Sequence, residues 1–213
     1  NDSLNAVKIL LGFSDGSFTG PVQTVTFPGT SDPYDVAAGD FDGDGDIELA
    51  VVHKDTPGKV SILVNNGGIN PNWNQFATLP VTITLESNTD SPESIRTADF
   101  DADGDLDLAI ANRLSENVSV LYNNGSGGFT RVSASPFAAA GSTLFFNARA
   151  RELAVGDVSG DGLPDLFVAN DGVDAVSLRL NTGGTNSQLN FAAPQDFPAA
   201  CFGSNGGTYS LSL

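Results

Sequence analysis

Short apolar runs bounded by turn residues recur along the whole chain. The runs VSILV, VSVLY and VSLRL begin at Val60, Val118 and Val176, and each leads into an Asn-Gly or Gly-Gly turn signal. Runs of this length that are rich in Val, Ile and Leu are typical of β-strands. The nearest approach to a helical pattern is residues 135–149, and its Gly, Ser and Pro residues favour a loop. The pattern predicts an all-β fold of many short strands.

The strand pattern repeats about every 58 residues. An acidic loop with an apolar tail reads GDFDGDGDIELAVV from Gly39, ADFDADGDLDLAIA from Ala98 and GDVSGDGLPDLFVA from Gly156. After each loop come the same strand, a polar turn and a second strand, followed by a phenylalanine. Repeats of this length with four short strands each are typical of propeller blades arranged around an axis. The aligned phenylalanines are expected in the core between blades: Phe18, Phe76, Phe129 and Phe191.

Both ends of the chain fit the same repeat. NDSLNAVKILLGF at residues 1–13 aligns with the segment that begins at Asn170, and GTYSLSL at residues 207–213 resembles the strand before the first acidic loop. We therefore expect one β-propeller domain of about four blades, three of them with acidic loops. Its parts are the outer strands of an incomplete blade, three blades and a closing inner strand: residues 1–30, 31–90, 91–148, 149–200 and 201–213.

The sequence leaves two closures of the incomplete blade open. The N- and C-terminal strands of one chain complete it, which gives a closed monomeric ring, or a neighbouring chain completes it by strand addition. Unpaired strand edges are a liability, so one of these closures is expected unless the chain is a fragment.

The charge of the chain is strongly negative and clustered. It has 26 acidic and 9 basic residues, which gives a formal net charge of −17. Such a surface repels nucleic acid and anionic lipid, and no apolar run reaches 18 residues, so neither nucleic acid nor membrane insertion is expected. The clustering indicates divalent cations as partners. Cys201 is the single cysteine, which excludes an intrachain disulfide and favours a small buried hydrophobe.

The acidic loops have the ligand spacing of a calcium site. Numbered from the leading aspartate, each loop has oxygen side chains at positions 1, 3, 5 and 9 and a glycine at position 6, where a sharp bend is needed. About six oxygen ligands suit Ca²⁺ better than Mg²⁺, which keeps waters in a strict octahedron. Ser159 replaces a carboxylate, so the third site is expected to be the weakest. The predicted side-chain ligands are Asp40, Asp42, Asp44 and Glu48; Asp99, Asp101, Asp103 and Asp107; and Asp157, Ser159, Asp161 and Asp165.

The spacing does not fit an EF-hand, which needs a bidentate Glu at position 12. That position holds Val51, Ile110 and Val168. The loops and the strands after them instead resemble the FG-GAP/VCBS repeat, which builds the propeller of integrin α-subunits and of many secreted proteins. The resemblance implies three Ca²⁺ sites, each between the first two strands of a blade. It also implies one backbone carbonyl ligand in each loop, at position 7: Asp46, Asp105 and Leu163.

Three functions are compatible with these features, and no ligand-binding residue is assigned beyond the calcium loops. The preferred one is a secreted or cell-surface structural or adhesive module with a protein or glycan ligand, since extracellular modules bind Ca²⁺ at about 10⁻⁴–10⁻³ M. A self-assembling extracellular filament subunit, joined by strand completion, is one alternative. A lectin-like propeller is another, with stacking candidates Trp73, Tyr34, Tyr122 and Tyr209.

An enzyme is not expected. His53 is the only histidine, and it aligns with Asn112 and Asn170 in the repeats, which favours a structural position at a strand end. The loop carboxylates are committed to metal, so no catalytic residue is assigned. Arg96, Arg149 and Arg151 are expected to form surface ion pairs.

Overall fold

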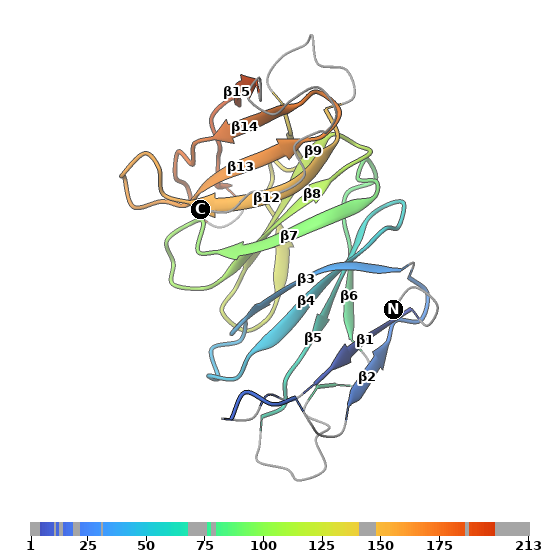
Figure 1. The fold of residues 1–213 in the computed structure, drawn as a ribbon. Coiled ribbons are helices and arrows are strands. Elements are labelled where there is room, and N and C mark those ends of the chain that lie inside the picture. The colour runs from blue at the N-terminus through green and yellow to red at the C-terminus, as the bar shows by residue number, and fades with distance from the viewer. Residues whose placement is uncertain are drawn as a thin grey trace.

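The computed structural model describes residues 5–10, 12, 15–18, 22–30, 32–67, 76–77, 80–140, 148–185 and 188–198. Its strands form four antiparallel sheets, which follow one another along the molecule in chain order (Figure 1). The described residues contain no α-helix, so the all-β prediction is confirmed. Accordingly, none of them lies in a helix with the length and hydropathy that crossing a bilayer requires.

Three sheets have the same up-and-down order of four main strands. The first sheet consists of β3 (Pro33–Gly39), β4 (Glu48–His53), β5 (Lys59–Leu63) and β6 (Val81–Thr84). The second consists of β7 (Pro92–Ala98), β8 (Asp107–Asn112), β9 (Asn117–Asn123) and β10 (Phe129–Arg131), and β11 (Phe137–Ala138) also pairs with β9. The third consists of β12 (Ala150–Gly156), β13 (Asp165–Asn170), β14 (Ala175–Arg179) and β15 (Gln195–Pro198).

The acidic loops join the first two strands of each of these sheets. The residue before each loop pairs with the residue at position 9: Gly39 with Glu48, Ala98 with Asp107, and Gly156 with Asp165. Each of these strand pairs also has one register shift at its other end. The repeated sequence therefore folds into three copies of one hairpin in the same register.

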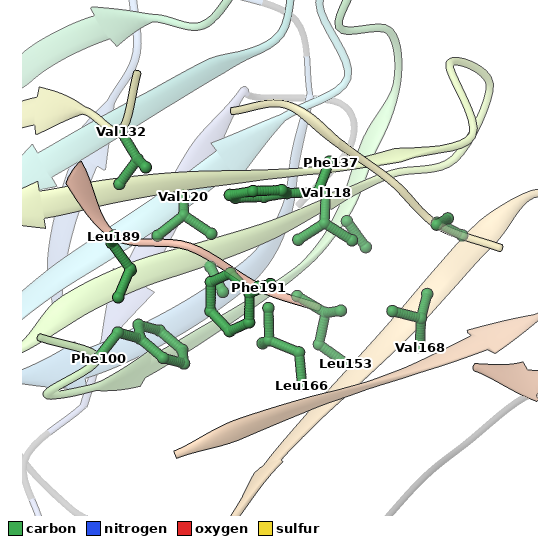
Figure 2. Close-up of a cluster of buried hydrophobic side chains, with 14 residues drawn as sticks. Phe100, Val118, Val120, Val132, Phe137, Leu153, Leu166, Val168, Leu189 and Phe191 are labelled. Carbon is green, nitrogen blue, oxygen red and sulfur yellow. The ribbon is translucent and has the colours of Figure 1, made fainter. Parts of the chain in front are cut away.

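Apolar residues from facing sheets form the core between them. One cluster lies between the first and second sheets, and another lies between the second and third (Figure 2). The phenylalanine at position 2 of a loop contacts the aligned phenylalanine of the next sheet edge-to-face. The ring centroids are 5.4 Å apart for Phe41 and Phe129 and 5.9 Å apart for Phe100 and Phe191. These aromatic pairs dock each acidic loop onto the following sheet.

The prediction of a core position is wrong for Phe18, whose exposed fraction is 67%. Phe129 and Phe191 are covered because an acidic loop of the preceding sheet packs on them. In the described part of the chain, no acidic loop precedes the sheet to which Phe18 aligns. Phe76 packs at the edge of a smaller cluster with residues of the first sheet.

The fourth sheet, here called the N-terminal sheet, has only β1 (Ala6–Ile9) and β2 (Gln23–Thr26). By sequence alignment, β1 and β2 match β14 and β15. Among the described residues, the N-terminal sheet has no strands that correspond to β12 and β13. The inner strand expected over residues 201–213 lies outside the described part of the chain.

The face of the first sheet that lies toward the N-terminal sheet is more exposed than the matching faces of the second and third sheets. Val36 in β3 is 48% exposed, whereas Ile95 and Leu153 are 0% exposed at the same position of β7 and β12. An apolar groove of about 300 Å³ lies there, lined by residues 6–8 of β1 and residues 33–36 of β3. Among the described residues, no strand of the N-terminal sheet covers Val36.

Truncation at these matched positions should have unequal effects on stability. Ile95→Ala should lower the free energy of unfolding by about 2–5 kcal/mol, because it opens a cavity between two sheets. Val36→Ala should change it by less than about 0.5 kcal/mol, as expected for an exposed side chain. Urea unfolding followed by circular dichroism measures both. Equal losses would show that the groove is covered in solution.

Candidate metal centres

The first acidic loop curls around its leading carboxylate. Asp40 accepts hydrogen bonds from the backbone N–H groups of Gly43 and Gly45, at 2.8 and 3.0 Å. Gly45, at position 6, has a φ of 91°, which a residue with a side chain rarely adopts. The N–H of Asp46 donates to Asp44 Oδ1 at 2.9 Å. These bonds hold the side chains at positions 1 and 5 in a tight turn.

The other two loops have the same turn. Asp99 accepts from the N–H groups of residues 103 and 104 at 3.1 and 3.0 Å, and Asp157 accepts from those of residues 160 and 162 at 2.7 and 2.9 Å. The position-6 glycines, Gly104 and Gly162, have φ values of 99° and 90°. The glycine requirement inferred from the sequence is confirmed by these angles.

The carboxylate at position 9 is the most buried carboxylate of each loop. Glu48, Asp107 and Asp165 are 1%, 0% and 0% exposed. Each accepts one bond from the N–H of position 2 in its own loop, at 2.8, 3.0 and 3.0 Å. Each also accepts one from the N–H of an asparagine at or just after the end of the next strand, at 3.4, 2.8 and 2.8 Å. These carboxylates therefore fix the loop to the sheet.

Three carboxylates converge in each of the first two loops. Oxygens of Asp40, Asp42 and Glu48 lie within 4.8 Å of one another, and those of Asp99, Asp101 and Asp107 do the same. Oxygens bound to one Ca²⁺ at about 2.3–2.6 Å lie at most about 5 Å apart, so this spacing fits a shared calcium ion.

The remaining predicted ligands are arranged differently. Asp44 and Asp103 are exposed and lie outside these two groups, and each accepts a bond from the N–H of position 7. In the described part of the chain, the third loop forms no comparable group of three carboxylates. Ser159 stands at its position 3, and Asp157 and Asp161 are exposed. Ligation by the carbonyls of residues 46, 105 and 163 stays a prediction.

The buried and exposed carboxylates differ in electrostatic environment. Burial raises the pKa of Asp107 to about 7, although the N–H groups of Asn123 and Phe100 oppose the shift. Burial likewise raises the pKa of Glu48. The pKa of Asp157 is lowered, because the N–H groups of Gly162 and Gly160 donate to it. A divalent cation would offset the unfavourable charge of the buried group.

An ion network whose partners were not predicted lies toward the strand ends opposite the acidic loops. Arg96 of the second sheet bonds Asp35 of the first at 3.1 Å and Glu152 of the third at 2.9 Å, so one guanidinium bridges three sheets. Arg151 and Arg113 meet at Asp171, and Lys54 pairs with Glu93. A polar cavity of about 240 Å³ lies among these residues. The expected ion pairs of Arg96 and Arg151 are confirmed, and Arg149 is exposed.

The other candidates from the sequence lie elsewhere. His53 is buried at the end of β4, and its Nε2 lies 2.9 Å from Ser61 Oγ. Asn112 and Asn170 make the matching bond to a serine of the next strand at 2.9 and 2.8 Å, which confirms the strand-end role of His53.

Tyr34 is 46% exposed, with the ammonium of Lys54 over its ring. Tyr122 packs against the core, and Trp73, Cys201 and Tyr209 lie outside the described residues.

Comparisons with known proteins identify the repeats. A model of the FG-GAP-like repeat matches residues 1–51, 40–110 and 99–168, and one of the FG-GAP repeat matches residues 150–188. No curated protein matches the sequence. The fold resembles the crystal structure of a protein from Lactobacillus plantarum, with a TM-score of 0.58 and 18% identity. The match covers 93% of this chain and 52% of that one, so the chain spans about half that protein's length.

The stability of the calcium-free protein should depend on the protonation of Asp107. Its folded-state pKa of about 7 lies above the ordinary value of 3.8, so the folded protein binds this proton more tightly. The contribution is complete below about pH 4 and is lost as the pH rises through about 7. Thermal melts in EGTA between about pH 4 and 8 measure it, and Asp107→Asn should flatten the profile in part, because Glu48 acts in the same direction.

Asp157→Asn is the matched control for this pH profile. Asp157 is exposed and its pKa is lowered, so its replacement should leave the loss of stability near pH 7 unchanged. Identical profiles for Asp107→Asn and the unaltered protein would contradict the assignment to Asp107.

Proposed function

Because the chain belongs to the FG-GAP-like repeat family, whose repeats build propeller-type binding modules, we propose that it is an extracellular calcium-binding β-propeller with a structural or adhesive role. The observation that carries the proposal is the convergence of three carboxylates in each of two loops, with the position-9 carboxylate buried in both. Repeats of this family are generally binding or structural rather than enzymatic, and we assign no catalytic residue.

The first two loops would each hold an ion through the carboxylates at positions 1, 3 and 9. A bound Ca²⁺ supplies positive charge at a point where like charges converge, because no basic residue lies within either loop. The carboxylate at position 9 holds the N–H of position 2, and it would keep this bond while one of its oxygens faces the ion. The third loop would bind more weakly, since Ser159 replaces a carboxylate there.

The calcium role favours a location outside the cell or on its surface. Sites of extracellular modules are half-filled at about 10⁻⁴–10⁻³ M Ca²⁺, far above cytosolic concentrations. The ions would serve the fold, because each loop joins the two inner strands of its sheet and packs against the next sheet.

The three four-stranded sheets are proposed as blades, with the N-terminal sheet as the outer half of another blade. The exposed Val36 and the groove between β1 and β3 support this arrangement. A strand placed in this groove would cover Val36. Closure by strands of the same chain gives a ring. The same features favour a second candidate function, a filament subunit in which a neighbouring chain supplies the strand.

Removal of calcium should destabilise the protein strongly. One site stabilises the fold by about 2.7 kcal/mol when free Ca²⁺ is about 100 times its Kd, so three sites contribute roughly 8 kcal/mol. For a domain of this size, that corresponds to a fall in Tm of about 15–30 °C. Differential scanning calorimetry in calcium and in excess EGTA measures the fall, with Mg²⁺ as the control ion. An unchanged Tm in EGTA would rule out structural calcium.

The two closures predict different masses in solution. Light scattering should give the mass of one chain, 21.9 kDa, if the incomplete blade is closed within the molecule. Species that grow with protein concentration, and that shrink when Val36→Lys places a charge in the groove, would indicate closure by a neighbouring chain instead. The substitution should leave the mass of a monomer unchanged.

A further inference from the structure

Two asparagines carry hydrogen bonds from one acidic loop to the next across the sheet interfaces. The side-chain amide of Asn123, at the end of β9, donates to the carbonyl of Phe41 in the first loop at 2.7 Å. Its backbone N–H donates to Asp107 Oδ1 of the second loop at 2.8 Å. Asn181, after β14, repeats this arrangement one sheet later, with Phe100 O at 2.7 Å and Asp165 Oδ1 at 2.8 Å.

The phenylalanines complete the connection within each loop. The N–H of Phe41 donates to Glu48 Oε2 at 2.8 Å, and that of Phe100 donates to Asp107 Oδ2 at 3.0 Å. Glu48 and Asp107 belong to the two groups of converging carboxylates. A continuous path of hydrogen bonds and peptide units thus joins all three loops, in the order Glu48, Phe41, Asn123, Asp107, Phe100, Asn181 and Asp165.

The path runs through buried groups, so its bonds are costly to break. Phe41, Phe100, Asn123 and Asn181 are all at most 2% exposed. Asn123 also donates to Leu106 O at 3.2 Å, which places its amide between two loops. The carbonyl of Phe41 also accepts from the N–H of Gly127 at 2.8 Å, so two bonds link the position of Phe41 to the segment that begins at Asn123, and breaking a buried bond of this kind costs free energy.

We propose that Asn123 and Asn181 are positioning residues that couple the calcium sites, so that an ion in one loop raises the affinity of the next. The inference rests on the proposed calcium function. An ion in the first loop fixes Glu48 and, through it, the peptide of Phe41. That peptide fixes the amide of Asn123, whose N–H orients Asp107 for the second ion. The second ion then meets a loop that is already ordered, which gives positive cooperativity.

Coupling of this kind is reciprocal, and it is measured by removing one site and observing the other. The measurement uses isothermal titration of calcium into the full chain carrying Asp157→Ala, which removes the leading carboxylate of the third loop. Adding Asp40→Ala then disables the first loop. This should weaken binding at the second loop about tenfold, within the range that positioning residues of metal ligands show.

The test of the asparagine is whether this loss depends on its side chain. In protein that also carries Asn123→Ala, the affinity of the second loop should be the same with or without Asp40→Ala. The backbone N–H of residue 123 is retained, so the bond to Asp107 is not removed directly. Asn123→Ser serves as a second variant if the alanine variant fails to fold, and circular dichroism at saturating calcium checks both.

Asn65 provides a matched control. It is the aligned asparagine of the first sheet, and its amide donates to Ile47 O at 3.2 Å within its own sheet. Among the described residues its side chain donates to no carbonyl of a neighbouring sheet. Asn65→Ala should therefore leave the tenfold coupling between the first and second loops intact.

The possible outcomes distinguish a failure of the coupling from a failure of calcium binding itself. No calcium uptake by the unaltered protein would overturn the proposed function itself. If calcium binds but Asp40→Ala does not change the affinity of the second loop, calcium binding is retained and the coupling is overturned. Coupling that survives Asn123→Ala and Asn123→Ser, or that Asn65→Ala also abolishes, would overturn the role of Asn123.

Discussion

The burial of the position-9 carboxylate in each acidic loop is the constraint on which the rest of the structure depends. Glu48, Asp107 and Asp165 lie at the start of the second strand of each sheet, where a charge is unfavourable. Burial raises the pKa of Glu48 and of Asp107 accordingly. Each carboxylate accepts from the N–H of position 2 of its loop and from the N–H of an asparagine at or just after the end of the next strand, and Asp165 also accepts from the N–H of Ser159. Without this anchor the loop would have no fixed relation to its sheet.

The anchored loop in turn sets the stacking of the sheets. By holding the N–H of position 2, the carboxylate directs Phe41 and Phe100 onto the following sheet, where each meets an aligned phenylalanine. The carbonyls of the same two residues accept the amides of Asn123 and Asn181. At the third loop the corresponding residue is Val158, which is 49% exposed. In the described part of the chain, the same position is therefore core where another sheet packs on it and surface at the third loop.

Much of the fold could be predicted because its determinants are local and repeated. The strands after the loops and the position-6 glycines each follow from a few adjacent residues, and three copies in one register reinforce them. The contacts of Arg96 with Asp35 and Glu152 could not be predicted, because they join residues about one repeat apart whose approach depends on sheet stacking. The exposure of Phe18 was missed for a related reason, since alignment assigns a position without stating whether a neighbouring sheet covers it.

The charged residues form two separate groups, one in which acidic and basic side chains pair and one that is acidic alone. Toward the strand ends that lie away from the acidic loops, four of the nine basic residues pair with four acidic ones. This network is therefore neutral without any partner. At the other end lie the acidic loops, whose carboxylates bond backbone N–H groups and whose sequence contains no basic residue. Hydrogen bonds from N–H groups orient a carboxylate but leave its charge in place. The excess of negative charge therefore resides where the oxygens converge, and the divalent cation that we propose there would satisfy both their charge and their geometry.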